Sequence, residues 1–225
     1  MNLFRYNLST FRAWQRQRCQ GSKADYLKLI PIAYPDMKTG LPLIVGHNPS
    51  ENKKKIKNGK RVNFGWKNFT KGKSLATAAK ETACIHKEDK EGQGTRKLLY
   101  FSRFEDLLGL TEKCYNHVDL FPGNKTDSKK LFTKNKRNRF ENAQIRRTLR
   151  LICDLKPSYI VVSSLEAGKI IREELKIDKT EVMLHVRKKF GRRTQTTIFF
   201  LPFLGHGLDH HSQELWRQYI EKTQK

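Results

Sequence analysis

Apolar positions along the chain gather in short runs that alternate with longer periodic segments. The short runs indicate buried strands at about 42–46, 114–121, 158–164, 181–186 and 196–201. Apolar residues with helical spacing indicate helices at about 8–19, 95–108, 139–155, 165–175 and from 212 onward. Strands that alternate with helices favour a parallel sheet covered by helices. The pattern therefore predicts an α/β fold.

The loops that follow the predicted strands carry most of the unusual residues. They lie at 46–50, 122–125, 163–164 and 202–211. Ligands of open parallel sheets bind at the carboxyl ends of the strands, where such loops meet. We therefore expect one functional edge, with 46–50 facing 202–211 across a cleft.

Charge indicates the class of partner. The 225 residues include 46 Lys and Arg against 22 Asp and Glu, a formal net charge of +24. Three basic clusters fall in predicted loops, at 53–73, 129–139 and 187–193. In the first of them, Phe64, Trp66 and Phe69 alternate with the basic residues. Polyanions bind such surfaces by releasing counterions, and aromatic residues among the cations suit stacking on bases. We predict a nucleic-acid partner and no membrane partner, although solvated loops are the simpler interpretation of any one cluster.

Cysteine spacing and hydropathy narrow the class of protein further. Four scattered cysteines without a C-x-x-C pair do not suggest a zinc ribbon or an iron–sulfur site. The longest apolar run, 198–204, is too short to cross a bilayer. We see no secretory signal, and expect a monomeric cytoplasmic protein of one domain, 1–225, with a basic insert at about 51–75 and no cofactor.

Four segments combine a predicted strand with a distinctive turn or helix start: "LPLIVGHNPS" (41–50), "YNHVDLFPGNK" (115–125), "LKPSYIVVSSLEAGK" (155–169) and "FFLPFLGHGLDHHS" (199–212). In this order they resemble the uracil-DNA glycosylase superfamily. The last segment has His206-Gly207-Leu208 where the family has His-Pro-Ser. The resemblance implies a three-layer α/β/α sandwich with a central, mostly parallel four-stranded sheet. It also implies a monofunctional DNA glycosylase.

The resemblance assigns catalysis to Asn48 and His206. Breaking the bond between deoxyribose and base builds positive charge on the sugar and negative charge on the base. Asn48 is expected to position the attacking water through its side-chain carbonyl, and His206 to donate a hydrogen bond to the leaving base. The alternatives are a turn-forming Asn48 and a loop histidine without a catalytic task.

Further residues are expected to hold the extruded base. A base inside a duplex must be flipped out before it can react. Gly46 and His47 of the first turn are assigned to substrate binding, and Asn116 to reading the base edge through its amide. Phe64 or Trp66 is expected to stack on the base, unless they are core residues.

The DNA itself is expected to contact a separate set of residues. Leu208 would fill the vacated stack as an apolar wedge. Ser163 and Ser164 precede a predicted helix and would hold phosphate, with helix capping as the alternative. The lysines that would contact the backbone are Lys53, Lys54 and Lys55.

Ser50 carries the expectation about substrate. Some relatives have a tyrosine just after the proline of this turn, whose ring excludes substituents at the pyrimidine C5 position. Serine leaves that space open. A C5-modified cytosine, such as the glucosylated hydroxymethylcytosine of some phage DNA, is therefore expected beside uracil, in antiviral defence or repair.

Two other classes of function remain open at this point. One is a non-catalytic nucleic-acid-binding module on the same fold. The other is a metal-dependent nuclease that uses Asp119, Asp209 and the histidines, although no compact carboxylate cluster is visible in the sequence. The His206 and His210 pair also suggests a metal, less strongly, because Gly207 and the lack of nearby cysteines argue against one.

Overall fold

A computed structural model describes residues 2–22, 24–47, 54–57, 60–92, 99–111, 113–123, 137–177, 185–190, 194–201 and 210–224. The chain forms two compact units, each assembled from separate segments. Unit 1 comprises 1–37, 48–97 and 121–128, and unit 2 comprises 38–47, 98–120 and 129–225. The single domain expected from the sequence stays a prediction, because this division describes packing within each unit only.

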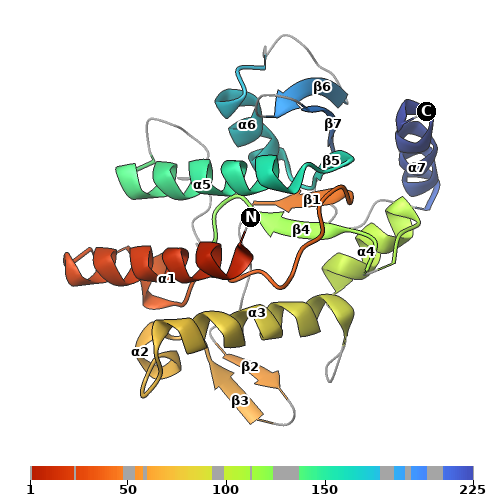
Figure 1. Ribbon diagram of the computed structural model, residues 1–225. Helices are drawn as coiled ribbons and strands as arrows, with labels where there is room; N and C mark the ends of the chain where they lie inside the picture. The colour runs from red at the N-terminus through yellow and green to blue at the C-terminus, as the bar shows by residue number, and fades with distance from the viewer. Residues whose placement is uncertain are drawn as a thin grey trace. The chain divides into compact units, whose positions relative to one another are not determined.

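Unit 1 contains three helices, a 3-10 turn and a hairpin among its described residues (Figure 1). These are α1 (Leu3–Cys19), η1 (Asp25–Lys28), β2 (Lys54–Lys57), β3 (Lys60–Asn63), α2 (Trp66–Phe69) and α3 (Leu75–Glu91). Phe11 and Trp14 of α1 are fully buried, and Trp14 packs against Tyr26 and Phe121. The basic insert expected at about 51–75 contains β2, β3 and α2, and it belongs to this unit.

Unit 2 contains a five-stranded sheet in the order β4-β1-β5-β7-β6. Its elements are β1 (Leu43–Gly46), α4 (Leu99–Leu108), β4 (Asn116–Asp119), α5 (Arg139–Leu155), β5 (Tyr159–Val162), α6 (Leu165–Glu174), β6 (His185–Phe190), β7 (Thr194–Phe200) and α7 (His210–Gln224). The strands β4, β1, β5 and β7 are parallel, and β6 joins the edge antiparallel to β7. The predicted α/β class with a mostly parallel sheet is confirmed.

Helices cover both faces of this sheet. Ile44, Val161 and Phe199 lie in register on one face and pack against α4 and α7. On the other face, Gly168 of α6 lies against the ring of Phe200. The connection from β4 through α5 to β5 crosses the sheet in the same direction as the connection that leaves β5 through α6. Because such connections are right-handed, α5 and α6 lie on the same face of the sheet. This arrangement is compatible with a three-layer sandwich.

Three expectations about the elements need correction. The sheet has five strands instead of four, because β6 adds an antiparallel edge. The strand expected at 181–186 lies at His185–Phe190, so its second half runs into the basic cluster 187–193. The stretch after β1 that the sequence left as long and polar contains the hairpin, α2 and the 17-residue helix α3.

No helix within the described ranges combines the length and the apolarity that crossing a membrane requires.

Candidate functional site

The carboxyl ends of three neighbouring strands bring together the candidate site in unit 2. Gly46 at the end of β1 lies in register with Asp119 at the end of β4. On the other side of β1, Ser163 follows β5 and its backbone N–H donates to the Val45 carbonyl at 3.0 Å. Parallel pairing thus gathers residues from 46, 119 and 163 at one edge, as the sequence predicted for 46 and 163.

Four polar side chains meet at this edge, and we call them the edge cluster: Tyr100, His117, Asp119 and Ser163. The phenol oxygen of Tyr100 lies 2.9 Å from Ser163 Oγ and 3.4 Å from His117 Nε2. His117 Nε2 lies 3.9 Å from Asp119 Oδ1. His117, Asp119 and Ser163 are each no more than 5% exposed. A phenol, an imidazole, a carboxylate and a hydroxyl therefore share one buried site.

The direction of the hydrogen bonds follows from Ser163. Its hydroxyl donates to the Val45 carbonyl at 3.1 Å, so the proton between Ser163 and Tyr100 comes from the phenol. The phenol oxygen is then left to accept from His117 Nε2. Burial, and next the negative charge of Asp119, raise the pKa of Tyr100 well above its usual value. Tyr100 is therefore a neutral donor at physiological pH.

Aromatic rings fix the imidazole. The ring of His117 meets Phe101 edge-on, with centroids 5.1 Å apart and planes at 90°, and it meets Tyr100 at 5.5 Å. Both aromatic residues come from α4, which packs on this face of the sheet. The helix thus holds both the phenol and the imidazole against the end of β4.

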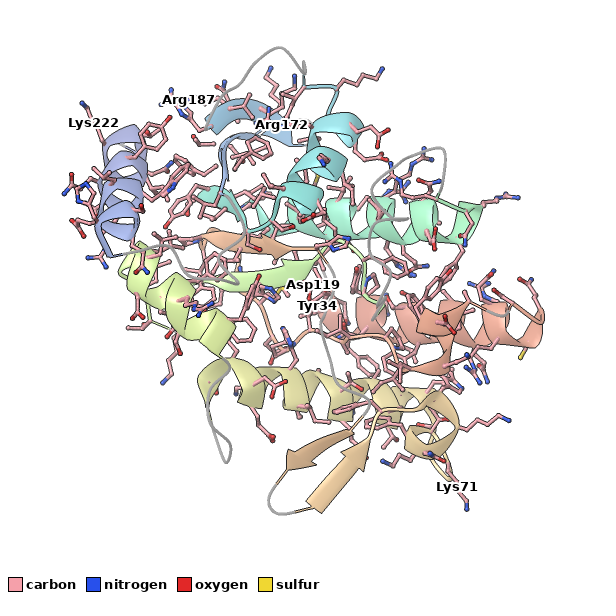
Figure 2. The ribbon with its side chains drawn as sticks, turned by 180° about the vertical axis from the view of Figure 1, so that it is seen from behind. Tyr34, Lys71, Asp119, Arg172, Arg187 and Lys222 are labelled. Atoms are coloured by element: carbon pink, nitrogen blue, oxygen red, sulfur yellow. The ribbon has the colours of Figure 1, made fainter. Side chains whose placement is uncertain are left out.

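Gly46 is required by the close approach of Asp119, which is labelled in Figure 2. A Cβ at Gly46 would lie 2.2 Å from Asp119 Oδ1 and 3.2 Å from the Tyr100 hydroxyl oxygen. Any side chain at 46 would occupy space that the carboxylate holds. The first predicted turn thus begins directly against the edge cluster, with His47 half-buried as the next residue.

The two serines differ from their expected role. Ser164 is the N-cap of α6 and accepts from the Ala167 N–H at 3.0 Å, which is the capping alternative. Ser163 is occupied by Tyr100 and Val45. Ser163 is only 2% exposed and Ser164 only 5%, so this conformation leaves both poorly placed to hold phosphate.

The expected base-reading role of Asn116 does not fit its position. Asn116 begins β4, at the opposite end of the strand from Asp119. Its amide oxygen accepts from the Lys38 N–H at 3.2 Å, and its amide nitrogen donates to the Lys38 carbonyl at 2.6 Å. The amide therefore joins two backbone segments.

Phe64 and Trp66 are core residues of unit 1, the alternative that the sequence left open. Phe64 is 2% exposed and stacks on Phe69 with centroids 5.9 Å apart, while Trp66 is 8% exposed and packs against Phe11. Neither ring presents a free face for a base. Lys54 and Lys55 lie in β2, where their backbones pair with Asn63 and Val62.

Several predicted residues lie outside the described ranges, and their roles stay predictions. They are Asn48, Ser50, Lys53, His206, Leu208 and Asp209. Sequence reasoning missed Tyr100 and His117, and it considered Asp119 only for a nuclease. The signal was present in "NHVD", because His117 and Asp119 are two apart on one strand and so project from the same face.

Within the described residues, no group of three or more His, Cys, Asp or Glu side chains is arranged to hold a metal ion. Comparison with models of known protein families gives no match, and no curated protein sequence is detectably similar to this chain. The superfamily resemblance therefore rests on the four segments alone.

Proposed function

We propose that this chain is a monofunctional DNA glycosylase, with the edge cluster as part of its active site. The observation that carries the proposal is the buried carboxylate of Asp119 against Gly46, two residues before Asn48. The resemblance assigns the attacking water to Asn48. The carboxylate therefore lies against a residue that precedes Asn48 by only two positions in the sequence.

The proposed reaction uses each group for a different charge. As the bond between C1′ and the base nitrogen breaks, its electron pair leaves with the base and positive charge develops on the sugar. The Asp119 carboxylate stabilises that positive charge in a site with little water. Water oriented by Asn48 adds to C1′, and its proton is released to the solvent. His206 donates a hydrogen bond to the base anion, which finally takes up a proton.

Positive charge and the residue at 50 support the substrate class. A net charge of +24 favours a polyanion, and the proposed base is a C5-modified cytosine, with uracil as the other candidate. Ser50 leaves the C5 side open, which suits the glucosylated hydroxymethylcytosine of phage DNA. An enzyme of this kind would act in antiviral defence or base-excision repair, as a cytoplasmic monomer.

Labelled duplexes that differ at one base test the proposal. The bases are uracil, hydroxymethylcytosine and its glucosylated form, and strand breaks are scored with and without alkali. A glycosylase gives breaks only after alkali. Direct metal-dependent breaks would indicate the nuclease, and DNA binding without any product would indicate the non-catalytic module.

Three variants locate the chemistry. Asn48→Ala, Asp119→Asn and His206→Ala should each slow single-turnover excision by roughly a hundredfold or more. Loss of one preorganised group has an effect of this size in other enzymes. DNA affinity should change little in all three. Asp154→Asn removes an exposed carboxylate from α5 of the same unit and serves as the matched control. Equal rates for Asp119→Asn and Asp154→Asn would remove Asp119 from the mechanism.

A further inference from the structure

The outward face of α1 carries a line of arginines. The inward face is buried and includes Phe11 and Trp14. Arg5, Arg12 and Arg16 are exposed, and they are spaced by seven and four residues, two turns and about one turn of helix. Their directions around the helix axis therefore differ by no more than roughly 40°, and the line is about 16 Å long. We call these three residues the α1 stripe.

The α1 stripe is not neutralised by its surroundings. The helix contains no Asp or Glu. No ion pair joins any of the three guanidinium groups to an acidic side chain among the described residues, whereas Lys28 pairs with Asp25 and Lys73 with Glu81 in the same unit. The neighbouring helix α3 adds a cation, because Lys80 Nζ lies 5.3 Å from the ring centroid of Phe4 on α1. The α1 stripe thus has no acidic partner among the described residues.

The fourth arginine of the helix has a different environment. Arg18 lies over the ring of Trp66 at 5.5 Å and donates to the Leu27 carbonyl. Its guanidinium therefore fastens α1 to the neighbouring segments of unit 1. The α1 stripe makes no such contact in the described structure, so stability does not explain its three charges.

We propose that the α1 stripe binds the phosphate backbone of DNA. Its length equals the rise of roughly five base pairs, so three guanidinium groups can reach successive phosphates along one strand. Lys67 and Lys71 of the same unit are also exposed, and Lys71 is labelled in Figure 2. The inference rests on the proposed DNA substrate, and it does not require base excision.

An anionic membrane is the other polyanionic surface that a basic helix can meet. A helix that lies in a membrane interface must bury an apolar face in the lipid. The apolar face of α1 is already buried inside unit 1, with Phe11 and Trp14 at 0% exposure. Phe4, at 39%, is its only large exposed apolar residue within the described structure. The helix therefore suits a polyanion that is contacted through charge alone.

Helix α5 supplies a matched control. Arg139, Arg146 and Arg150 are also exposed and have the same spacing of seven and four residues. This line is partly compensated, since Arg146 Nε lies 3.9 Å from Glu174 Oε2 and Asp154 follows Arg150 by one turn on the same helix. Triple substitution to Gln in either helix removes the same charge from the whole chain.

The test compares Arg5→Gln/Arg12→Gln/Arg16→Gln with Arg139→Gln/Arg146→Gln/Arg150→Gln in the full chain. Anisotropy of a fluorescein-labelled unmodified duplex is measured over a range of salt concentrations. The α1 triple variant should lower the slope of log affinity against log salt by about 2 to 3, since each phosphate contact contributes about 0.9. The α5 variant should lower it by no more than about 1, the contribution of a single contact from Arg139 at the end of the basic cluster 129–139. Equal slopes in the two variants would overturn the proposal.

Two further measurements separate the possible failures. Each single Arg→Gln change in α1 should lower the slope by about 1, which keeps the test valid if the triple variant folds poorly. Loss of binding to phosphatidylserine vesicles with unchanged DNA binding would assign the stripe to membranes and overturn the proposal. If the wild type excises nothing, the glycosylase proposal fails, while the slope result still decides the stripe.

Discussion

Replacing Gly46 with alanine tests the geometry of the edge cluster most directly. The new Cβ would lie 2.2 Å from Asp119 Oδ1 and 3.3 Å from Asp119 Cγ. Non-bonded heavy atoms rest at about 3.5–4.0 Å, so the carboxylate must retreat by roughly 1 Å or more. Overpacking of this kind in a filled interior costs about 1–3 kcal/mol. Gly46 has no positive φ, so the substitution adds no backbone strain.

A smaller effect opposes the clash. Alanine restricts the unfolded chain more than glycine does and thereby stabilises a protein by about 0.4–1 kcal/mol where the backbone conformation is permissive. The clash outweighs this gain, so Gly46→Ala should lower the free energy of unfolding, measured in urea, by about 1–2 kcal/mol. In an Asp119→Ala background the offending oxygen is gone. There the same change should be neutral or stabilising.

The double-mutant cycle therefore isolates one contact. We expect a coupling free energy of at least about 1 kcal/mol between positions 46 and 119, within the range found for touching residues. Gly168→Ala is the control, because its Cβ would lie 3.3 Å from Phe200 Cδ1 and alanine is favoured within a helix. It should cost little in either background. If Gly46→Ala has the same effect with and without Asp119, the carboxylate does not lie against Gly46 and the proposed site loses its basis.

Three further predictions concern stability, titration and substrate. Arg137 is buried and pairs with Glu173 at 2.6 Å, so Arg137→Ala should lower the free energy of unfolding in urea by about 3–5 kcal/mol. Arg146→Ala removes an exposed arginine that lies 3.9 Å from Glu174, and it should cost no more than about 1 kcal/mol. A loss for Arg137→Ala as small as that for Arg146→Ala would contradict this. Burial, then Asp119, raises the pKa of Tyr100, and burial, then Glu221, raises the pKa of Tyr159 to about 12. In a near-ultraviolet titration of the native protein, both phenols should therefore ionise above the usual pH range of tyrosine. Unfolded phenols ionise near pH 10, so the stability contributed is complete below that pH and is lost as pH rises toward the folded pKa; Tyr100→Phe should make this alkaline loss shallower, and an unchanged loss would count against the buried phenol. Ser50→Tyr should abolish excision of a bulky C5-modified cytosine and spare excision of uracil in single turnover, while equal losses on both would place Ser50 away from C5.

The sequence predicted the parallel strands well, because their apolar runs are buried on both faces. β1 and β5 lie within two residues of their predicted ends. The strand that corresponds to β6 was predicted at 181–186 but lies at His185–Phe190, because Arg187, Lys188 and Lys189 indicated a solvated loop. An edge strand tolerates such residues, since pairing with β7 uses the backbone and charged side chains protect the open edge.

Helix α3 was missed for a related reason. Its first turns are rich in alanine and threonine, and Leu75 is the only large apolar residue before Ile85, too few to mark a helical face. The local signals were nevertheless present, since Ser74 caps its start and Gly92, with a positive φ, ends it. The Asn58-Gly59 pair between β2 and β3 was likewise a hairpin signal that charge obscured.

The edge cluster was only half predictable. Strand alternation places His117 and Asp119 on one face, but nothing in local sequence links them to Tyr100 on α4. That link arises from packing of α4 against β4 and β1. Asn116 shows the converse error, because a strand asparagine was assigned to substrate when its amide serves the Lys38 backbone.

The interleaving of the two units sets the order in which they can fold during synthesis. All segments of unit 1 lie within the first 128 residues, whereas unit 2 needs β5 and β7 from the last third of the chain. Unit 1 can therefore be complete while β1 and β4 still await their neighbours. Until β5 leaves the ribosome, the side of β1 that will pair with it is an open apolar edge, the kind of surface that promotes aggregation. Chaperone contact is most needed in that interval, and neither unit can be produced alone as one continuous fragment.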